Sequence, residues 1–381
     1  MTTVEPRAEA RPAPSPGWLR GPAFDIILVA LPWVLFYVWI TWSLGLGRAG
    51  VGLAALSPAA ERKALGLAMI AALAATYVHR HYTFFVVYGD PGTFSQMARR
   101  FIVAPIVIFG AVAAAKLTST DDRPAALSPW GILLVLTGAW NIWHTIQQRY
   151  GILRIYGGKA RGGLETPAAA RRDRALFWAM AAVTTGVVAG WRRQLFAGHG
   201  NAQRTREIVE PIATSMPGRA LTALLVIGGL CAIAWWAQAE ARASIAPSSR
   251  AARLWFAGST VALFAVFIAH GPIVGYLCFG VAHALEYLAF VHHFGHAKLG
   301  ARPSGSVAAV LLGRPLLSAP LLIGALLAAY FALKDAASTD AYLVYYTGTT
   351  LLHFLYDGWI WKVRKPAVGA PLGVEAQAAG G

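Results

Sequence analysis

Cysteine and charged residues are scarce in this sequence. Among its 381 residues there are only two cysteines, Cys231 and Cys278, and both lie inside apolar segments. A disulfide framework or a cysteine-based zinc site is therefore excluded. Charged residues make up 13% of the chain, whereas hydrophobic residues make up 57%. This balance is typical of a polytopic membrane protein.

Acidic residues are the scarcer of the charged types. The chain has 17 Asp and Glu against 33 Lys and Arg, which gives a formal net charge of +16. In a soluble protein such a charge would suggest a nucleic-acid partner. Here the basic residues lie in short loops between apolar segments, as the positive-inside rule describes for membrane proteins. We therefore expect the lipid bilayer as a partner, and no nucleic acid.

Apolar segments long enough to cross a bilayer recur along the whole chain. We expect an all-α, polytopic transmembrane helical bundle of about ten spans that forms a single domain over 21–365. A disordered tail rich in Pro and Ala precedes it at 1–20, and a flexible tail follows it at 366–381. The expected spans are 23–45, 65–87, 101–117, 130–150, 176–191, 221–239, 254–268, 273–294, 316–333 and 342–363.

Basic residues gather in alternate loops of this scheme. They lie at 99–100, 149–174, 242–253, 298–314 and 362–365, whereas most of the other loops are neutral or mixed. The exception is the segment 192–219, which carries five arginines. The asymmetry predicts that both termini are cytoplasmic. We expect a multi-pass protein of the bacterial inner (plasma) membrane.

The eighth expected span is unusually rich in ionisable residues. The segment 271–298 reads GPIVGYLCFGVAHALEYLAFVHHFGHAK and carries His283, Glu286, His292, His293 and His296. Each such side chain inside a membrane costs a few kcal/mol, so these residues are usually functional. On a helix His283, Glu286 and His293 share a face, but the two histidines are about 15 Å apart, too far for one metal ion.

Histidines recur on three other spans. His79 and His81 lie on the second span, about 200° apart around a helix, so only one of them can face a shared centre. The fourth span carries His144, and the tenth carries His353 with Asp357 one helical turn later. All of these spans are even-numbered, and their histidines lie in the middle or inner half. The sequence therefore predicts that they converge at one depth.

This set of side chains predicts a metal centre. Iron and other first-row metals favour imidazole together with carboxylate, and facing helices can build one-metal or two-metal sites from such residues. We expect non-haem iron, one or two ions, with candidate ligands His79, His81, His144, His283, His293 and His353. Glu286 and Asp357 are the candidate catalytic groups, either as ligands or as partners that orient the imidazoles. Helical spacing does not distinguish these two roles.

Two other functions remain open. Paired histidines on facing helices could hold haem in a b-type cytochrome. The carboxylates in register argue against it, because an axial pair needs none. The His, Glu and Asp set could also relay protons in a coupled transporter. Against this, the two halves of the chain show no internal repeat, and the ionisable residues lie to one side of the midplane.

A basic group follows the fourth span: Arg149, Arg154, Lys159 and Arg161. Its simplest role is to orient the protein in the membrane. Alternatively, these side chains steady an anionic lipid headgroup or an acyl carrier at the mouth of a site on the inner side.

The overall plan resembles two groups of membrane enzymes. His-rich spans that converge near the cytoplasmic face resemble the integral-membrane non-haem iron oxygenases of the fatty-acid desaturase and hydroxylase group. The closest motif is HHFGH at 292–296, an HHxxH in the reverse order of a desaturase box, whereas the desaturase boxes themselves are absent. The chain also resembles the Brp/Blh group of carotene-cleaving dioxygenases, which implies His144, His283 and His353 as iron ligands.

These resemblances imply an oxidoreductase that uses iron on a lipophilic substrate such as an acyl lipid or a carotenoid. The desaturase resemblance also implies an electron-donor protein as a further partner.

Overall fold

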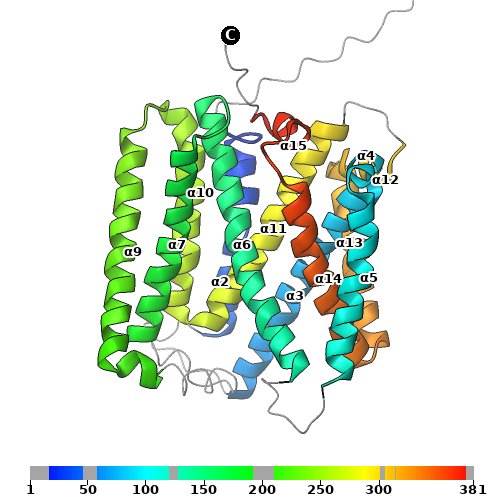
Figure 1. Ribbon diagram of the computed structural model, residues 1–381, viewed down its shortest axis with the longest axis horizontal. Coiled ribbons are helices and arrows are strands. Elements are labelled where there is room, and N and C mark those ends of the chain that lie inside the picture. The colour runs from blue at the N-terminus through cyan, green and yellow to red at the C-terminus, as the bar shows by residue number, and fades with distance from the viewer. Residues whose placement is uncertain are drawn as a thin grey trace, which may run out of the picture.

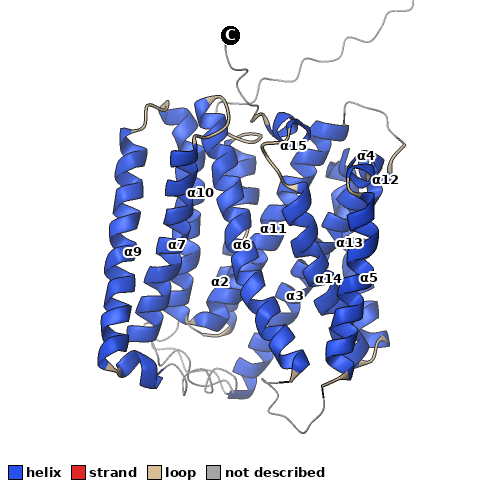
Figure 2. Cartoon of the chain, in the orientation of Figure 1, coloured by secondary structure: helices blue, strands red, loops and turns tan. Residues whose placement is uncertain are grey.

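The computed structural model describes residues 17–45, 58–119, 128–191, 210–300, 305–313 and 315–374. Every regular element in these segments is a helix (Figure 2), so the all-α prediction is confirmed. The helices are α1 (Pro22–Phe24), η1 (Asp25–Ala30), α2 (Val34–Ser43), α3 (Pro58–Gly89), α4 (Pro91–Gln96), α5 (Ala98–Leu117), α6 (Pro129–Arg161), α7 (Pro167–Trp191), α9 (Met216–Arg242), α10 (Pro247–His270), α11 (Pro272–Leu299), α12 (Val307–Gly313), α13 (Pro315–Ala336), α14 (Thr339–Ile360), α15 (Pro366–Gly369) and η4 (Ala370–Leu372).

Six of these helices are long and apolar enough to cross a membrane. They are α5, α7, α9, α10, α11 and the part of α13 from Ser318 to Ala336. A seventh is added if the pair Pro22–Ala30 and Val34–Ser43, bent by 41°, counts as one span. This set is consistent with an integral membrane protein, but six or seven is fewer than the ten spans expected. The other long helices, α3, α6 and α14, carry polar side chains that lower their hydropathy.

Helix α11 forms the centre of the bundle (Figure 1). In its most apolar 18 residues 72% are buried, against 17% in α5 and in α9. It packs against α3, α6 and α10. Helices α7 and α9 lie side by side at one end of the molecule, and α5 packs against α14 toward the other. The central helix is therefore the one best placed to hold a buried site.

Close packing of α7 against α9 depends on small residues. A Cβ added to Gly229 would lie 2.6 Å from Val183 Cγ2, and one added to Gly186 would lie 2.8 Å from Val226 Cγ2. Small residues let helix backbones approach closely, which is a common basis of helix association in membranes.

Local sequence signals explain the length of α6. Ser128 caps the start of α6, because its side-chain oxygen accepts a hydrogen bond from the backbone N–H of Gly131 at 3.1 Å. Pro129 fits the first turn because a backbone N–H at that position would have no partner within the helix. Gly162 ends the helix with a φ of 70°, which glycine adopts at little cost. The helix thus continues to Arg161, well beyond the expected end of the fourth span at residue 150.

The C-terminal segment 366–374 packs against the bundle. We expected a flexible tail from residue 366, but α15 and η4 occupy this segment, and Leu372 and Val374 are buried. Lys159 Nζ donates to the carbonyl of Leu372 at 3.3 Å. A Cβ on Gly158 would lie 2.6 Å from Val374 Cγ1, so this glycine allows the close approach. Residues 375–381 and residues 1–16 of the expected N-terminal tail lie outside the described residues.

Candidate metal centre

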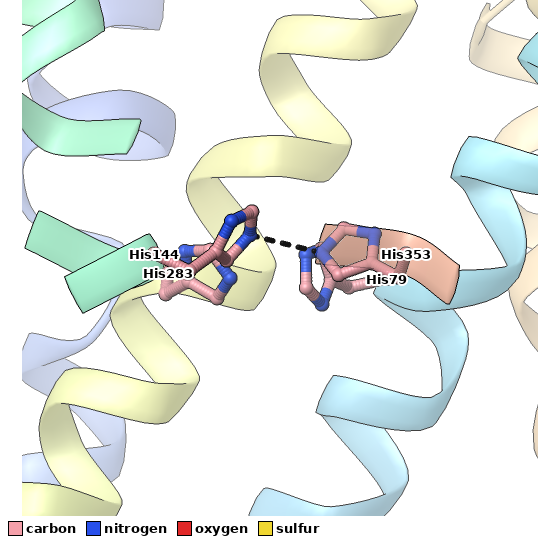
Figure 3. A group of neighbouring side chains, drawn as sticks. All are labelled: His79, His144, His283 and His353. Carbon is pink, nitrogen blue, oxygen red and sulfur yellow. Dashed lines mark hydrogen bonds between the residues drawn. The ribbon is translucent and has the colours of Figure 1, made fainter. Parts of the chain in front are cut away.

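Four helices bring one histidine each to a common point in the bundle (Figure 3). They are His79 on α3, His144 on α6, His283 on α11 and His353 on α14. One ring nitrogen of each lies within 4.8 Å of the others, and all four side chains are buried. Nitrogens on opposite sides of a metal ion, each bound at about 2.1 Å, are about 4.2 Å apart. The four-histidine cluster therefore has nearly the dimensions of a single coordination sphere.

Two of the four imidazoles lack hydrogen-bond partners. Neither nitrogen of His79 and neither nitrogen of His283 is paired with another described residue. A buried polar group left unsatisfied costs about 1–3 kcal/mol, so such groups need an explanation. A metal ion bound by these nitrogens would provide one. An all-imidazole donor set suits iron, copper, nickel or zinc.

The protonation state of His353 follows from its neighbours. Its Nδ1 lies 2.8 Å from Thr83 Oγ1, and the Thr83 hydroxyl, which has one hydrogen to donate, lies 3.0 Å from Asp357 Oδ1 and 2.6 Å from the Tyr287 hydroxyl. When Thr83 gives this hydrogen to Asp357, Nδ1 of His353 is the donor to Thr83. The Nε2 lone pair is thereby left to face the cluster, where it lies 3.1 Å from His144 Nε2. A chain of this kind fixes the imidazole tautomer that a metal ligand requires.

Asp357 is held beside the cluster by several donors. Its Oδ1 accepts hydrogen bonds from the hydroxyl of Tyr287 at 2.8 Å, from Thr83 at 3.0 Å and from Trp361 Nε1 at 3.2 Å. Its Oδ2 lies 3.6 Å from the Nε2 of His353. One carboxylate oxygen is thus fixed by the protein, and the other lies next to the imidazoles.

We expect Asp357→Asn to weaken metal binding about 10–100-fold, the usual cost of changing a residue that orients a ligand. The amide keeps an acceptor for Tyr287, Thr83 and Trp361, but it removes the negative charge beside the imidazoles. Titration against a competing chelator measures the effect. Asp340→Asn is the matched control on α14, because Asp340 forms an exposed ion pair with Lys116. Equal metal affinity in both variants would contradict the role of Asp357.

The other two predicted histidines lie elsewhere. The side chain of His81 points away from the cluster: its Nδ1 lies 2.7 Å from the carbonyl of Tyr77, and its Nε2 lies 2.7 Å from the hydroxyl of Tyr345. His293 packs its ring near that of Phe24, with the centroids 6.2 Å apart. Four of the six candidate ligands thus come together, and His81 and His293 do not join them.

Glu286 forms an ion pair that is separate from the cluster. Both of its oxygens bind Arg149, Oε2 at 3.1 Å from Nε and Oε1 at 2.5 Å from Nη2, and both side chains are completely buried. Arg149, which sequence analysis assigned to a basic inner loop, is therefore a buried residue of α6. The sequence held a reason to expect this ion pair, because a buried glutamate in a membrane protein needs a cationic partner.

A polar layer lies one helical turn beyond the histidines. Each cluster histidine is followed four positions later by a polar residue: Thr83, Gln148, Tyr287 and Asp357. Residues four apart share a helix face, so the four side chains lie toward the same end of the bundle. Gln148 belongs to this layer through a 3.0 Å bond from its Nε2 to the carbonyl of His283. Thr83 and Tyr287 were not among the predicted site residues, although this common spacing identifies them.

A cavity of about 400 Å³ adjoins the site. Its inner end is formed by His144 and Asp357, and its walls include several aromatic side chains: Trp143, Tyr287, Phe290, Phe354 and Trp361. Its other end is lined by charged residues, among them Glu165 in the connection between α6 and α7. Burial, and then the neighbouring Asp173, raise the pKa of Glu165 to about 7, although Arg253 and other cations oppose this shift.

Comparisons with known proteins give no match: no protein-family model, no curated protein and no solved structure is similar to this chain. The interpretation of the site therefore rests on its own residues.

Proposed function

We propose that the four-histidine cluster binds non-haem iron and that the protein is a membrane-embedded oxidoreductase acting on a lipophilic substrate, such as an acyl lipid or a carotenoid. The observation that carries this proposal is the pair of buried imidazoles, His79 and His283, whose nitrogens have no partner among the described residues. They lie within 4.8 Å of the ligand nitrogens of His144 and His353.

The protein's own residues would hold and shield this centre. The four histidines would bind the iron, and the hydrogen bonds of Asp357 and Thr83 would hold His353 in the tautomer that a ligand requires. Bound iron would supply the redox chemistry with dioxygen that amino-acid side chains lack. The aromatic walls of the cavity offer an apolar substrate a matching apolar surface.

A haem at this position is disfavoured by the lack of space. The rings of His283 and His353 have centroids 6.3 Å apart, but the ring of His79 lies 4.4 Å from the first and 4.2 Å from the second. A porphyrin between the two would collide with His79. The spacing supports a mononuclear site bound directly by imidazole.

We also propose that the bundle crosses the bacterial inner membrane about ten times with both termini cytoplasmic. Helices α3, α6 and α14 have 32, 33 and 22 residues, enough to span a bilayer, and many of their polar residues are buried inside the bundle. The C-terminal ends of α3, α6, α11 and α14 lie at the same end as α15 (Figure 1). Basic residues follow or lie near several of these ends, as expected for the cytoplasmic side.

Oxygen uptake by the iron-loaded protein tests this function. Detergent-purified protein, loaded with Fe(II) without oxygen, should consume dioxygen when a carotenoid, or an acyl lipid together with an electron donor, is added in mixed micelles, and mass spectrometry should then show an oxidised product. Its visible spectrum should lack a Soret band. A Soret band, or dioxygen uptake that is unchanged in His144→Ala, would overturn the proposal.

A further inference from the structure

The two ends of the cavity differ in chemistry. The inner end meets the cluster at His144, and the walls beyond it are aromatic, including Trp143, Phe290 and Phe354. The outer end is lined by Arg154, Lys362 and Arg364 together with one acidic residue, Glu165. A ligand that matches both ends needs an apolar body and a charged head.

The charge of the outer end is positive. Glu165 binds Arg161 at 2.8 Å, and it shares Arg253, at 3.2 Å, with Asp173 and Glu240. Arg154 approaches it only to 3.7 Å, and Nε of Arg154 has no hydrogen-bond partner among the described residues. These contacts leave the charge of Arg154 available to a ligand.

Two further cations are exposed at the cavity mouth. Lys362 and Arg364 follow the end of α14, and no acidic side chain of the described segments pairs with either of them. Hydrogen bonds from such cations to an anion are among the strongest in proteins. The outer end of the cavity therefore favours binding of a negatively charged group.

The size of the cavity limits the apolar body. Arg154 follows His144 by ten residues on α6, so the charged end and the cluster are separated by about 15 Å along the helix axis. The volume of about 400 Å³ is near the lower limit for ligand pockets, which range from about 300 to 1,000 Å³. One chain fits such a space more readily than a lipid with two chains.

We propose that this cavity binds a single-chain anionic lipid, with its headgroup at Arg154, Lys362 and Arg364 and its acyl or polyenyl chain along the aromatic wall toward the histidines. The inference rests on the proposed function only in taking this lipid as the substrate. Binding itself requires neither metal nor dioxygen, so it is measured on the metal-free protein.

The test compares cis-parinaric acid, a fluorescent fatty acid with a conjugated tetraene, with its uncharged methyl ester. Energy transfer from tryptophan, including Trp143 and Trp361 in the cavity wall, reports binding in micelles of a neutral detergent. Arg154→Gln should weaken binding of the acid about tenfold or more and leave the ester nearly unchanged, because a charge-assisted contact is lost. Each probe partitions into the micelles to the same extent for every variant, so this partition does not affect the comparison of variants with one probe.

A second variant and a control guard against effects on folding. Lys362→Gln changes an exposed side chain at the same cavity mouth, and it should also weaken binding of the acid without weakening binding of the ester. Lys116→Gln, in the exposed ion pair with Asp340, removes the same charge far from the cavity and should change neither probe. Equal losses for acid and ester in Arg154→Gln and Lys362→Gln, or no loss in either variant, would overturn the proposal.

Competition identifies the headgroup. Palmitic acid or hexadecyl phosphate should displace cis-parinaric acid, whereas hexadecanol at the same concentration should not. Displacement by only one of the two anions would distinguish a carboxylate from a phosphate head, and either result supports an anionic lipid. Displacement by hexadecanol as well would contradict it. Selective binding of the acid by protein that never binds iron would keep this inference and remove the proposed function.

Discussion

His79→Ala and His283→Ala are each expected to weaken iron binding by at least about 100-fold. Changing a residue that merely orients a metal ligand costs about 10–100-fold, and loss of a ligand should cost at least the upper part of that range. These two imidazoles are the ones with no other partner among the described residues, so their loss removes metal contacts and no hydrogen bond of the structure. Iron content after dialysis and titration against a chelator measure the effect.

The chain supplies matched controls on the same helices. His81 lies two residues from His79 on α3, so His81→Ala is the control for His79→Ala. His293 lies ten residues from His283 on α11, so His293→Ala is the control for His283→Ala. Both histidines are outside the cluster, so both variants should retain the iron of the parent protein. If all four variants lost iron equally, the four-histidine cluster would not be the binding site.

Separating Arg149 from Glu286 is expected to lower the free energy of unfolding by about 3–5 kcal/mol. Both side chains are completely buried, and Glu286→Gln leaves the guanidinium without its charged partner in a medium where charge is poorly solvated. The double variant Arg149→Met/Glu286→Leu should recover much of the loss, because a buried ion pair often contributes little more than well-packed apolar residues. Denaturant-induced unfolding in detergent measures these differences.

The Lys116–Asp340 ion pair is the exposed counterpart of this pair. Lys116→Met should change the free energy of unfolding by less than about 1 kcal/mol, as is usual for ion pairs at a surface.

The iron content of the folded fraction of Glu286→Gln separates a structural role of Glu286 from a role at the metal. A variant that unfolds like the parent but has lost its iron would show that Glu286 acts at the metal and not in the framework.

The convergence of histidines was predictable because helix direction and depth can be inferred from sequence. His144, His283 and His353 lie on even-numbered expected spans, which run in the same direction, at similar depth, and the structure brings them together with His79. The choice between His79 and His81 could not be made in this way. The two side chains point about 200° apart, and only packing against the neighbouring helices decides which one faces inward.

The angular position of Glu286 around its helix did not predict its partner. Its offset of about 60° from His283 seemed small enough to place both residues in one site. At a helix interface this offset is enough to direct one side chain to the cluster and the other to Arg149 on α6. The position of Arg149 was missed because α6 continues beyond the apolar part of its sequence.

The number of spans is difficult to infer because several of the helices that supply the histidines have low hydropathy. Six helices are apolar enough to be recognised as candidate spans, or seven if the bent pair is one span. Three of the four helices that supply the histidines, α3, α6 and α14, are not among them. Many of their polar side chains are buried inside the bundle, so if these helices cross the membrane as proposed, composition alone fails to identify them.

X-ray absorption at the iron K-edge of the purified protein tests the central claim most directly. A metal ion in the four-histidine cluster should have a first shell of nitrogen and oxygen atoms, with the outer-shell scattering of several imidazole rings and no contribution from sulfur or porphyrin. The same spectrum from His283→Ala should show weaker imidazole scattering or no bound iron. Iron whose spectrum lacks imidazole, or shows a porphyrin, would contradict the account.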